Sequence, residues 1–493
     1  MFTMTEKTPK WITPFTKQCF VTLGVSLAMM QMGLIMGFST ILLPQLKSPG
    51  SSIPIDDNYG SWLASLPAVT ILIGNFTVPS IMGKFGRKVA NLTLLLITTM
   101  GWICIVLASN ITTLLAARSL QGVAMGMVST LGPVLVGEYT SPRNRGAFLM
   151  TISITIGIGV LAIHAMGSYL NWQTSALICI AITVIDLVIV LSSPESPVWL
   201  ADQGRYDECK TIFRWLRGDT EESELEQMVE KSKMLKKAKD EDDSSTDTCM
   251  IKMKNNLRYF GQTLKRNEFY KPIVIMVHIY TMAQWSGVNI LASYAYDLIH
   301  NTIGKDINVP IMIIALGCNR IISNTIALIL IRKISRKIML CLTIGLNIVA
   351  LLATAGYTYC KTNDLITFEN EYIGIALIHI LTLSIGMGSL PICFILAGEI
   401  YPIQFKSMAG GISASFFSLN MFISLKTTPL FLNTIGIHGS FIVNAGLLTY
   451  CLVVAGIMLP ETKDKTLQEI EESFRGHKKP VNVVEKITNK SEA

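Results

Sequence analysis

The chain has 493 residues, of which 50% are hydrophobic and only 15% are charged, and its mean hydropathy is +0.47. Because soluble proteins carry about 25% charged residues, this composition excludes an ordinary water-soluble domain and indicates a chain that folds in a lipid bilayer. A net charge of +7 can indicate a nucleic-acid partner, but the basic residues are distributed as membrane topology requires, so no nucleic acid is expected.

Twelve apolar runs are long enough to span a bilayer. The first six lie at about 19–45, 61–82, 89–109, 113–136, 147–169 and 174–193. The other six lie at about 271–297, 308–331, 338–357, 372–397, 408–431 and 439–459. We therefore predict an all-α membrane protein with these parts: an N-terminal tail (1–18), a six-helix half (19–193), an insert (194–270), a second six-helix half (271–459) and a C-terminal tail (460–493).

Lysine and arginine set the predicted orientation. Placing the N-terminus inside puts the tails, the insert and the even-numbered loops on one side, where most basic residues lie, while the opposite loops hold only Lys47, Lys305 and Lys361. By the positive-inside rule, both termini and the insert are predicted to be cytoplasmic. The first run is too long for a cleaved signal peptide and is interpreted as a signal anchor.

The insert is predicted to be partly helical. Between Tyr206 and Leu216, apolar residues recur at helical spacing, which indicates an amphipathic helix. The charged stretch 218–256 is interpreted as a flexible linker.

Short motifs recur in the two halves at an offset of about 250–265 residues. Each pair follows equivalent runs: Gly83–Lys88 and Arg332–Lys337, Glu138 with Arg145 and Glu399 with Lys406, Pro194–Pro197 and Pro460–Lys463. The repeat indicates two halves of the same orientation, related by duplication. Such halves enclose a central cavity and rock about a site near the middle of the membrane.

Together these motifs resemble the sugar porter family of the major facilitator superfamily, over nearly the whole chain. Further matching motifs are Arg118 with Gln121-Gly122, Gln284-x-Ser286-Gly287-Val288-Asn289, and the PETKDKTL sequence from Pro460 to Leu467. Gly167–Trp172, Gly204-Arg205 and Lys426-Thr427 look most like the insect facilitated trehalose transporters. The resemblance implies the major facilitator fold in the plasma membrane and a small-molecule sugar as substrate. It implies nothing about oligomeric state.

The resemblance also implies a cytoplasmic network of charges that holds the outward-open state together, each pair breaking as the halves part. The residues concerned are Arg87, Glu138, Arg145, Arg336, Glu399, Lys406, Glu195 and Glu461. The simpler alternative is that they orient the chain and cap helices. Acidic residues contribute little to orientation, which favours the network.

Sugar hydroxyls need amides and hydroxyls at membrane depth beside apolar walls. Gln284 and Asn289 lie about 140° apart on an ideal helix, so a helix break at Ser286-Gly287 is needed for both to face one cavity. Tyr294 and Asn319 are further candidates. The alternative is that these groups make hydrogen bonds between helices.

The resemblance also implies that Ser153, Phe394 and Phe417 lie in the sugar site, but several of its positions depart from the family pattern. Ser153 and Ala283 replace glutamines, Phe394 replaces a tryptophan, and Phe417 replaces an asparagine. Each lost polar group removes about 0.5–1.5 kcal/mol of net hydrogen bonding. We expect a less polar cavity, hence either a different substrate or low affinity.

Three functions remain open. Ser39 stands where family symporters carry an aspartate, which favours passive transport, whereas Asp186 within the sixth run is a candidate proton carrier for a sugar symporter. A non-transporting sugar sensor is the third. No nucleophile–base set is visible, and the scattered cysteines show no metal-ligand spacing, so we expect neither enzymatic activity nor a metal or other cofactor. Asn110 begins a glycosylation sequon in a predicted outer loop.

Overall fold

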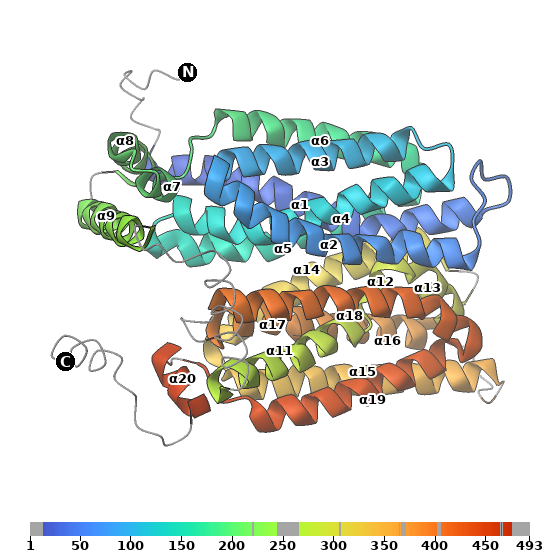
Figure 1. Ribbon diagram of the computed structural model, residues 1–493. Coiled ribbons are helices and arrows are strands. Elements are labelled where there is room, and N and C mark those ends of the chain that lie inside the picture. Colours follow the sequence, from blue (N-terminus) through green and yellow to red (C-terminus); the bar gives the residue numbers. More distant parts are fainter. Residues whose placement is uncertain are drawn as a thin grey trace.

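The computed structural model describes residues 13–218, 221–243, 266–304, 307–363, 365, 371–401, 406–463, 465 and 467–475. The regular structure of these residues is entirely helical, and it forms two bundles that lie one against the other (Figure 1). The first bundle contains the N-terminal half of the chain and the second contains the C-terminal half.

The N-terminal bundle consists of six long helices. They are α1 (Pro14–Lys47), α2 (Asp57–Phe85), α3 (Arg87–Val106), α4 (Ile111–Tyr139), α5 (Pro142–Tyr169) and α6 (Trp172–Ser192). Four of them begin at a polar side chain that accepts a hydrogen bond from a backbone N–H of the first turn, as N-caps do: Thr13, Asp56, Asn110 and Asn171. Small residues let helices approach closely. A Cβ on Gly126 of α4 would lie 2.1 Å from the Ile71 carbonyl oxygen of α2.

The C-terminal bundle is less regular. Its helices are α11 (Asn267–Trp285), α12 (Val288–Ser293), α13 (Ala295–Thr302), α14 (Val309–Lys333), α15 (Arg336–Thr362), α16 (Glu371–Ser384), the π-helical turn η2 (Ile385–Ser389), α17 (Leu390–Glu399), α18 (Lys406–Thr434) and α19 (Gly436–Met458). The π-helical turn interrupts one span just before Pro391, whose missing N–H and ring disfavour a regular helix there.

The helices account for all twelve predicted spans. Within the described residues, ten helices are long and apolar enough to cross a membrane, counting 371–399 as one. The seventh predicted span is divided among α11, α12 and α13, of which α12 and α13 are short and α11, with 19 residues, begins with polar residues. The eleventh, α18, has 29 residues but contains many polar side chains. The prediction of an all-α, twelve-span membrane protein is therefore confirmed.

Four shorter helices lie beyond one end of the bundles (Figure 1), which we call the insert end. They are α7 (Pro197–Asp202), α8 (Tyr206–Arg217), α9 (Glu222–Asp243) and α20 (Leu467–Arg475). The amphipathic helix predicted at Tyr206–Leu216 is confirmed as α8, which buries Cys209, Phe213 and Leu216.

The prediction of a flexible linker at 218–256 is wrong for its first part, which contains α9. This charged helix buries Leu225 and Val229 against Phe213 of α8. Its first turns are also tied to α8 by ion pairs, since Arg217 contacts Glu224 at 2.8 Å. With only about two apolar positions in every two turns, the sequence pattern was too weak to predict this helix among its many charged residues. The remainder of the predicted linker, from 244 onward, lies outside the described residues.

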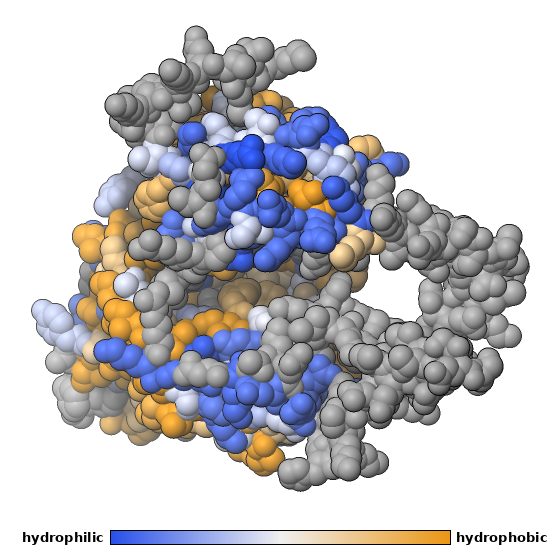
Figure 2. Space-filling view, turned by 90° about the vertical axis from the view of Figure 1, so that its left-hand side faces the viewer, coloured by the Kyte–Doolittle hydropathy of each residue, from blue (hydrophilic) through white to orange (hydrophobic). Residues whose placement is uncertain are grey.

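The two bundles contact each other through α2 with α18, α5 with α14, and α1 with α12. At the end opposite the insert, which we call the far end, Lys426 of α18 donates hydrogen bonds to Asn58 and Ser61 of α2. Figure 2 looks onto the insert end, where hydrophilic residues cover each bundle and an apolar recess lies between them. The molecule is therefore closed at the far end and open at the insert end.

Candidate functional site

A break in the seventh span brings two predicted site residues together. α11 ends at Trp285, and α12 begins after Gly287, whose φ of +95° lies in the left-handed region that favours glycine. The chain turns there, so the Asn289 amide nitrogen donates to the Gln284 carbonyl oxygen at 3.0 Å and to its side-chain oxygen at 2.9 Å. The break that the Ser286-Gly287 pair suggested is present.

Ser424 of α18 completes this cluster, which we call the amide cluster (Gln284, Asn289 and Ser424). The Asn289 amide nitrogen lies 3.1 Å from the Ser424 hydroxyl, and all three side chains are buried. Within the described chain, neither the Gln284 amide nitrogen nor the Asn289 side-chain oxygen has a hydrogen-bond partner. The cluster therefore retains one donor group and one acceptor for a ligand.

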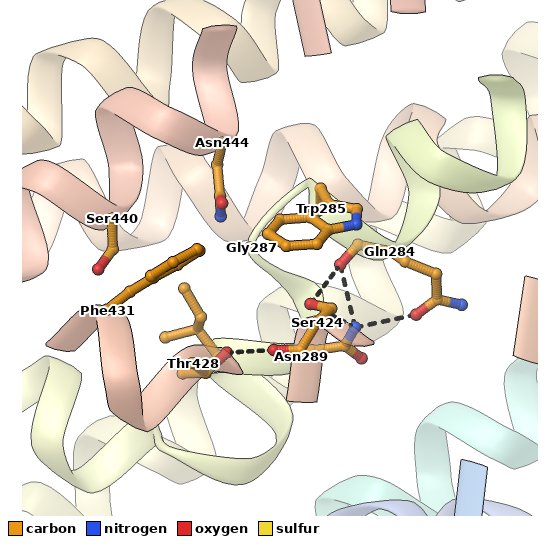
Figure 3. A pocket seen from close by; sticks show the side chains of 10 residues that line it. Gln284, Trp285, Gly287, Asn289, Ser424, Thr428, Phe431, Ser440 and Asn444 are labelled. Atoms are coloured by element: carbon orange, nitrogen blue, oxygen red, sulfur yellow. Dashed lines mark hydrogen bonds between the residues drawn. The ribbon is translucent and has the colours of Figure 1, made fainter. Parts of the chain in front are cut away.

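The amide cluster lines a small pocket within the C-terminal bundle (Figure 3). Trp285 and Phe431 form aromatic walls, with ring centroids 6.4 Å apart. Thr428, Ser440 and Asn444 add polar groups. Aromatic walls beside a few fixed amides and hydroxyls are what a small polar ligand with an apolar ring face requires.

Sequence reasoning missed Ser424, Thr428, Ser440 and Asn444. They belong to the eleventh and twelfth spans, and each pair is separated by four residues, the spacing of one helix face. Polar residues at this spacing inside apolar runs were the available signal.

The other predicted site residues do not join the amide cluster. Asn319 of α14 donates to the His379 carbonyl oxygen at 2.8 Å, so it connects two helices of one bundle. Tyr294 is buried between α12 and α13. Phe394 is exposed, and its ring lies 6.2 Å from that of Phe417. Ser153 is half-buried on α5.

A charge cluster lies at the insert end of the N-terminal bundle. The Arg87 guanidinium contacts the Glu138 carboxylate at 2.8 Å, and the Ser196 hydroxyl donates to the same carboxylate. Glu195 accepts hydrogen bonds from the backbone N–H groups of Arg87 and Lys88, at 2.9 and 3.2 Å. The Glu138 carboxylate therefore binds the Arg87 side chain, and the Glu195 carboxylate binds the backbone N–H groups at the start of α3.

The C-terminal bundle repeats this arrangement atom for atom. Arg336 contacts Glu399 at 2.9 Å, and the Thr462 hydroxyl donates to Glu399 at 2.7 Å. Glu461 accepts from the backbone N–H of Arg336 at 2.9 Å. The correspondence supports the duplication read from the sequence motifs.

These ion pairs correct part of the predicted network. Both lie within a single bundle, and both are intact although the recess at the insert end is open. They do not have to break for the halves to part, because neither of them crosses between the halves. Arg145 makes no ion pair within the described chain, and its Nε is buried without a partner. The Lys406 side chain lies outside the described residues.

The two glutamates of the repeated loops differ in acidity. Burial raises the pKa of the Glu195 carboxyl, and its N–H donors offset this only in part. Burial acts in the same direction on Glu461, but hydrogen bonds from the N–H groups of Lys463, Arg336 and Lys337 outweigh it and lower its pKa.

Arg118 is fully buried among the helices of the N-terminal bundle. Its guanidinium donates to the carbonyl oxygens of Leu63 and Ile35, to the Gln121 side chain at 2.8 Å and to the Ser39 hydroxyl at 2.9 Å. Every acceptor is neutral. Arg118 thus ties α1, α2 and α4 together, and no carboxylate balances it within the described residues.

Asp186 is completely buried in α6, beside Gly24 of α1. Neither carboxyl oxygen has a hydrogen-bond partner in the described part of the chain, and no ion pair forms there. Asn110 is exposed at the far end, where its side-chain oxygen caps α4 by accepting from the Thr113 N–H.

Comparison with known proteins gives the family. A profile of the family described as "Sugar (and other) transporter" matches residues 19–474. The chain belongs to this transporter family. It is consequently a multi-pass membrane protein, as its apolar helices also indicate.

Among individual members of this transporter family, the chain is similar to proteins named facilitated trehalose transporter Tret1. It is 26% identical to the one from Culex quinquefasciatus over 471 residues, which cover 95% of the chain and 88% of the relative. It is 28% identical to the one from Bombyx mori, covering 92% and 86%. It is 26% identical to the one from Drosophila yakuba, with 95% of the chain but only 53% of that relative covered. The chain thus spans about half the length of the Drosophila relative.

Solved structures of transporters show the same fold. An inward-open conformation of the xylose transporter XylE from E. coli superposes with a TM-score of 0.71 at 17% identity, covering 93% of this chain and 99% of the other. A structure of the proton:xylose symporter XylE bound to 6-bromo-6-deoxy-D-glucose matches equally well. The major facilitator fold is therefore confirmed.

Proposed function

We propose that this protein is a facilitative transporter of a small sugar, trehalose or a hexose, that works by alternating access. The amide cluster carries the proposal. At a break in a spanning helix, it combines an unengaged amide donor and acceptor with two aromatic walls, in a molecule whose halves are closed at one end and open at the other.

Several relatives named facilitated trehalose transporter support this substrate class. The support is for the class of sugar and not for one sugar, because Ala283, Phe394 and Phe417 leave fewer polar groups than the family pattern provides. A less polar site binds hydroxyls more weakly, which suits a carrier working at high sugar concentrations.

The surroundings of Arg118 support passive transport over proton coupling. A carboxylate in place of Ser39 would lie against the Arg118 guanidinium and would titrate with conformation, but the hydroxyl carries no exchangeable charge. A proton symporter that uses Asp186 is the second candidate, since that residue is buried without a partner in the described part of the chain. A non-transporting sensor is the third.

We also propose a plasma-membrane location with both termini and the insert in the cytoplasm. The insert end carries the basic residues of both repeated loops, including Arg87, Lys88, Arg336 and Lys337. The Asn110 sequon lies at the far end and would then be extracellular. The open recess would face the cytoplasm.

Counterflow in proteoliposomes tests the proposal. Vesicles loaded with unlabelled trehalose or glucose should take up the labelled sugar transiently, and Asn289→Ala should cut that uptake about tenfold or more by removing several hydrogen bonds. Asn420→Ala is the matched control, because it removes an amide from α18 outside the amide cluster. Sugar binding without counterflow would favour a sensor. Normal uptake by the Asn289→Ala protein would show that the amide cluster is not the sugar-binding site.

A further inference from the structure

A second cavity lies between the two bundles and has two basic residues in its wall. It is lined by α5, α12, α13, α14 and the α16–η2 segment, mostly with aliphatic side chains. Arg320 of α14 and His164 of α5 are the ionisable residues in the wall. They come from opposite halves of the molecule.

Arg320 is a cation with no counter-charge. It lies at the middle of α14 (Val309–Lys333), and it makes neither a hydrogen bond nor an ion pair with any described residue. Arg118, the buried arginine of the other half, has four hydrogen bonds instead. A guanidinium inside a membrane protein is costly unless something satisfies it, so its exposure to a cavity indicates a functional role.

His164 is buried, with 6% of its surface exposed, and also lacks a full complement of partners. Its Nε2 makes no hydrogen bond of ordinary geometry within the described chain, although the ring lies against the backbone of Gly37. Arg320 and His164 line the same cavity. Two nitrogen donors from opposite halves thus converge on one apolar cavity, in which no carboxylate forms part of the wall.

We propose that this pair binds an anionic group, so that the transporter accepts a sugar carrying a carboxylate or a phosphate. The inference rests on the proposed transport function and names a substrate class for it. Guanidinium groups bind both anions through paired N–H donors, and the apolar wall strengthens such bonds by excluding water. Arg320 and His164 belong to different halves of the molecule. An anion bound to both would therefore connect the halves and favour the conformation in which the cavity between them is closed.

The pair should make the transporter prefer a charged sugar over its neutral isostere. The measurement is inhibition of labelled glucose counterflow in proteoliposomes by glucuronate, by its methyl ester and by glucose 6-phosphate. We expect glucuronate or glucose 6-phosphate to inhibit at least about tenfold better than the methyl ester, as expected for hydrogen bonds to a charged group. Comparing the two acids separates a carboxylate from a phosphate substrate.

Variants assign the preference to the pair. Arg320→Gln should reduce the ratio of acid to ester inhibition to near one, and Arg320→Lys should keep part of it. His164→Gln should lower it less. Arg205→Gln removes an exposed positive charge of α8 and should leave the ratio unchanged.

A direct binding assay keeps this inference separate from the proposed function. Glucuronate should raise the thermal unfolding temperature of the detergent-solubilised wild type more than its methyl ester does, and more than chloride does. Glucose counterflow with no preference for either acid would overturn the anion proposal alone. Stabilisation by an acid without any glucose counterflow would support it while contradicting neutral-sugar transport. Equal stabilisation by chloride would reduce the pair to a small-anion site and overturn the proposed substrate class.

Discussion

Arg118, Arg320 and Asp186 lie within spanning helices, and their partners distinguish their roles. Arg118 donates four hydrogen bonds and ties three helices together, whereas Arg320 faces a cavity and has no partner among the described residues. Asp186 has no hydrogen-bond partner among the described residues. The sequence does not show these partners, and the hydrogen bonds of the structure separate the three residues.

Asp186→Asn should therefore leave transport intact. Its carboxyl makes no hydrogen bond with a described residue, and an asparagine of the same shape avoids burying a charge. We expect uptake within about twofold of wild type and an equal or higher unfolding temperature, because no ion pair is lost. The measurement is sugar uptake by wild type and variant at several external pH values. If the wild type shows pH-dependent uptake that the variant lacks, Asp186 is a proton carrier.

Individual site residues were only partly predictable from the sequence. Gln284 and Asn289 were found because they belong to one motif, and the Ser286-Gly287 pair between them indicated the break. Ser424 and Asn444 come from distant spans, and no motif connects them to the seventh span. The state of the charge network could not be predicted either, because a sequence pattern does not say whether a pair lies within one half or between two.

At the scale of elements, apolar runs predicted the spanning helices well because the bilayer fixes their length. Elements outside the membrane lack that constraint. For α9, Leu225 and Val229 provide the buried face among many charges, so its composition indicated a linker. The helix break at Gly287 was predictable because a Ser-Gly pair stands inside an apolar run between Gln284 and Asn289, and its glycine has a positive φ.

The break at Gly287 should be sensitive to any side chain. Gly287→Ala places a Cβ on a left-handed backbone, which costs about 1–2 kcal/mol, and the alternative of a regular helix would separate Gln284 from Asn289. We expect a lower unfolding temperature together with reduced sugar uptake. Gly345→Ala in α15 is the control, because nothing lies within 4 Å of its Cβ position and its helical backbone accepts alanine.

The repeated loops should respond to pH with opposite signs. The pKa of Glu195 is raised in the fold, so its contribution to stability falls as pH rises from the ordinary glutamate value through the raised one. The pKa of Glu461 is lowered, so its contribution is present above the ordinary value and is lost as pH falls through the lowered one.

Accordingly, Glu195→Gln should raise the unfolding temperature at neutral pH, and Glu461→Gln should lower it. Both differences should shrink as pH falls toward about 4, where glutamates take up protons. Thermal unfolding of the two purified variants across this pH range tests the assignment. Changes of the same sign in both variants would show that the two loops are electrostatically equivalent.

At the scale of the molecule, polar side chains join the two halves at the far end. Lys426 lies over the Trp62 ring at 4.1 Å and bonds Asn58 and Ser61, while Asn433 donates to Asp57 at 3.0 Å. These contacts join α18 to α2 and would have to break for the far end to open. They cross between the halves, whereas the ion pairs at the insert end each lie within one half, so we expect them to stabilise the observed state.

Lys426→Gln should shift the molecule toward opening at the far end. A cysteine introduced at Thr40, which lies at the contact between α1 and α12, would report this through faster alkylation in a background without other reactive cysteines. Lys361→Gln is the control, because that lysine bonds the Ile303 carbonyl oxygen within one bundle at the same end. Equal alkylation rates in both variants would mean that Lys426 does not hold the far end closed.

The central claim is that sugar moves through this protein without being driven by protons. The most direct measurement is the final internal concentration of labelled trehalose and glucose in proteoliposomes, with and without an imposed pH gradient. With Ser39 in place of an acid and Arg118 bound to neutral acceptors, we predict that internal and external sugar become equal in both conditions. Accumulation above the external concentration that appears only with the gradient would contradict the account and identify a proton symporter.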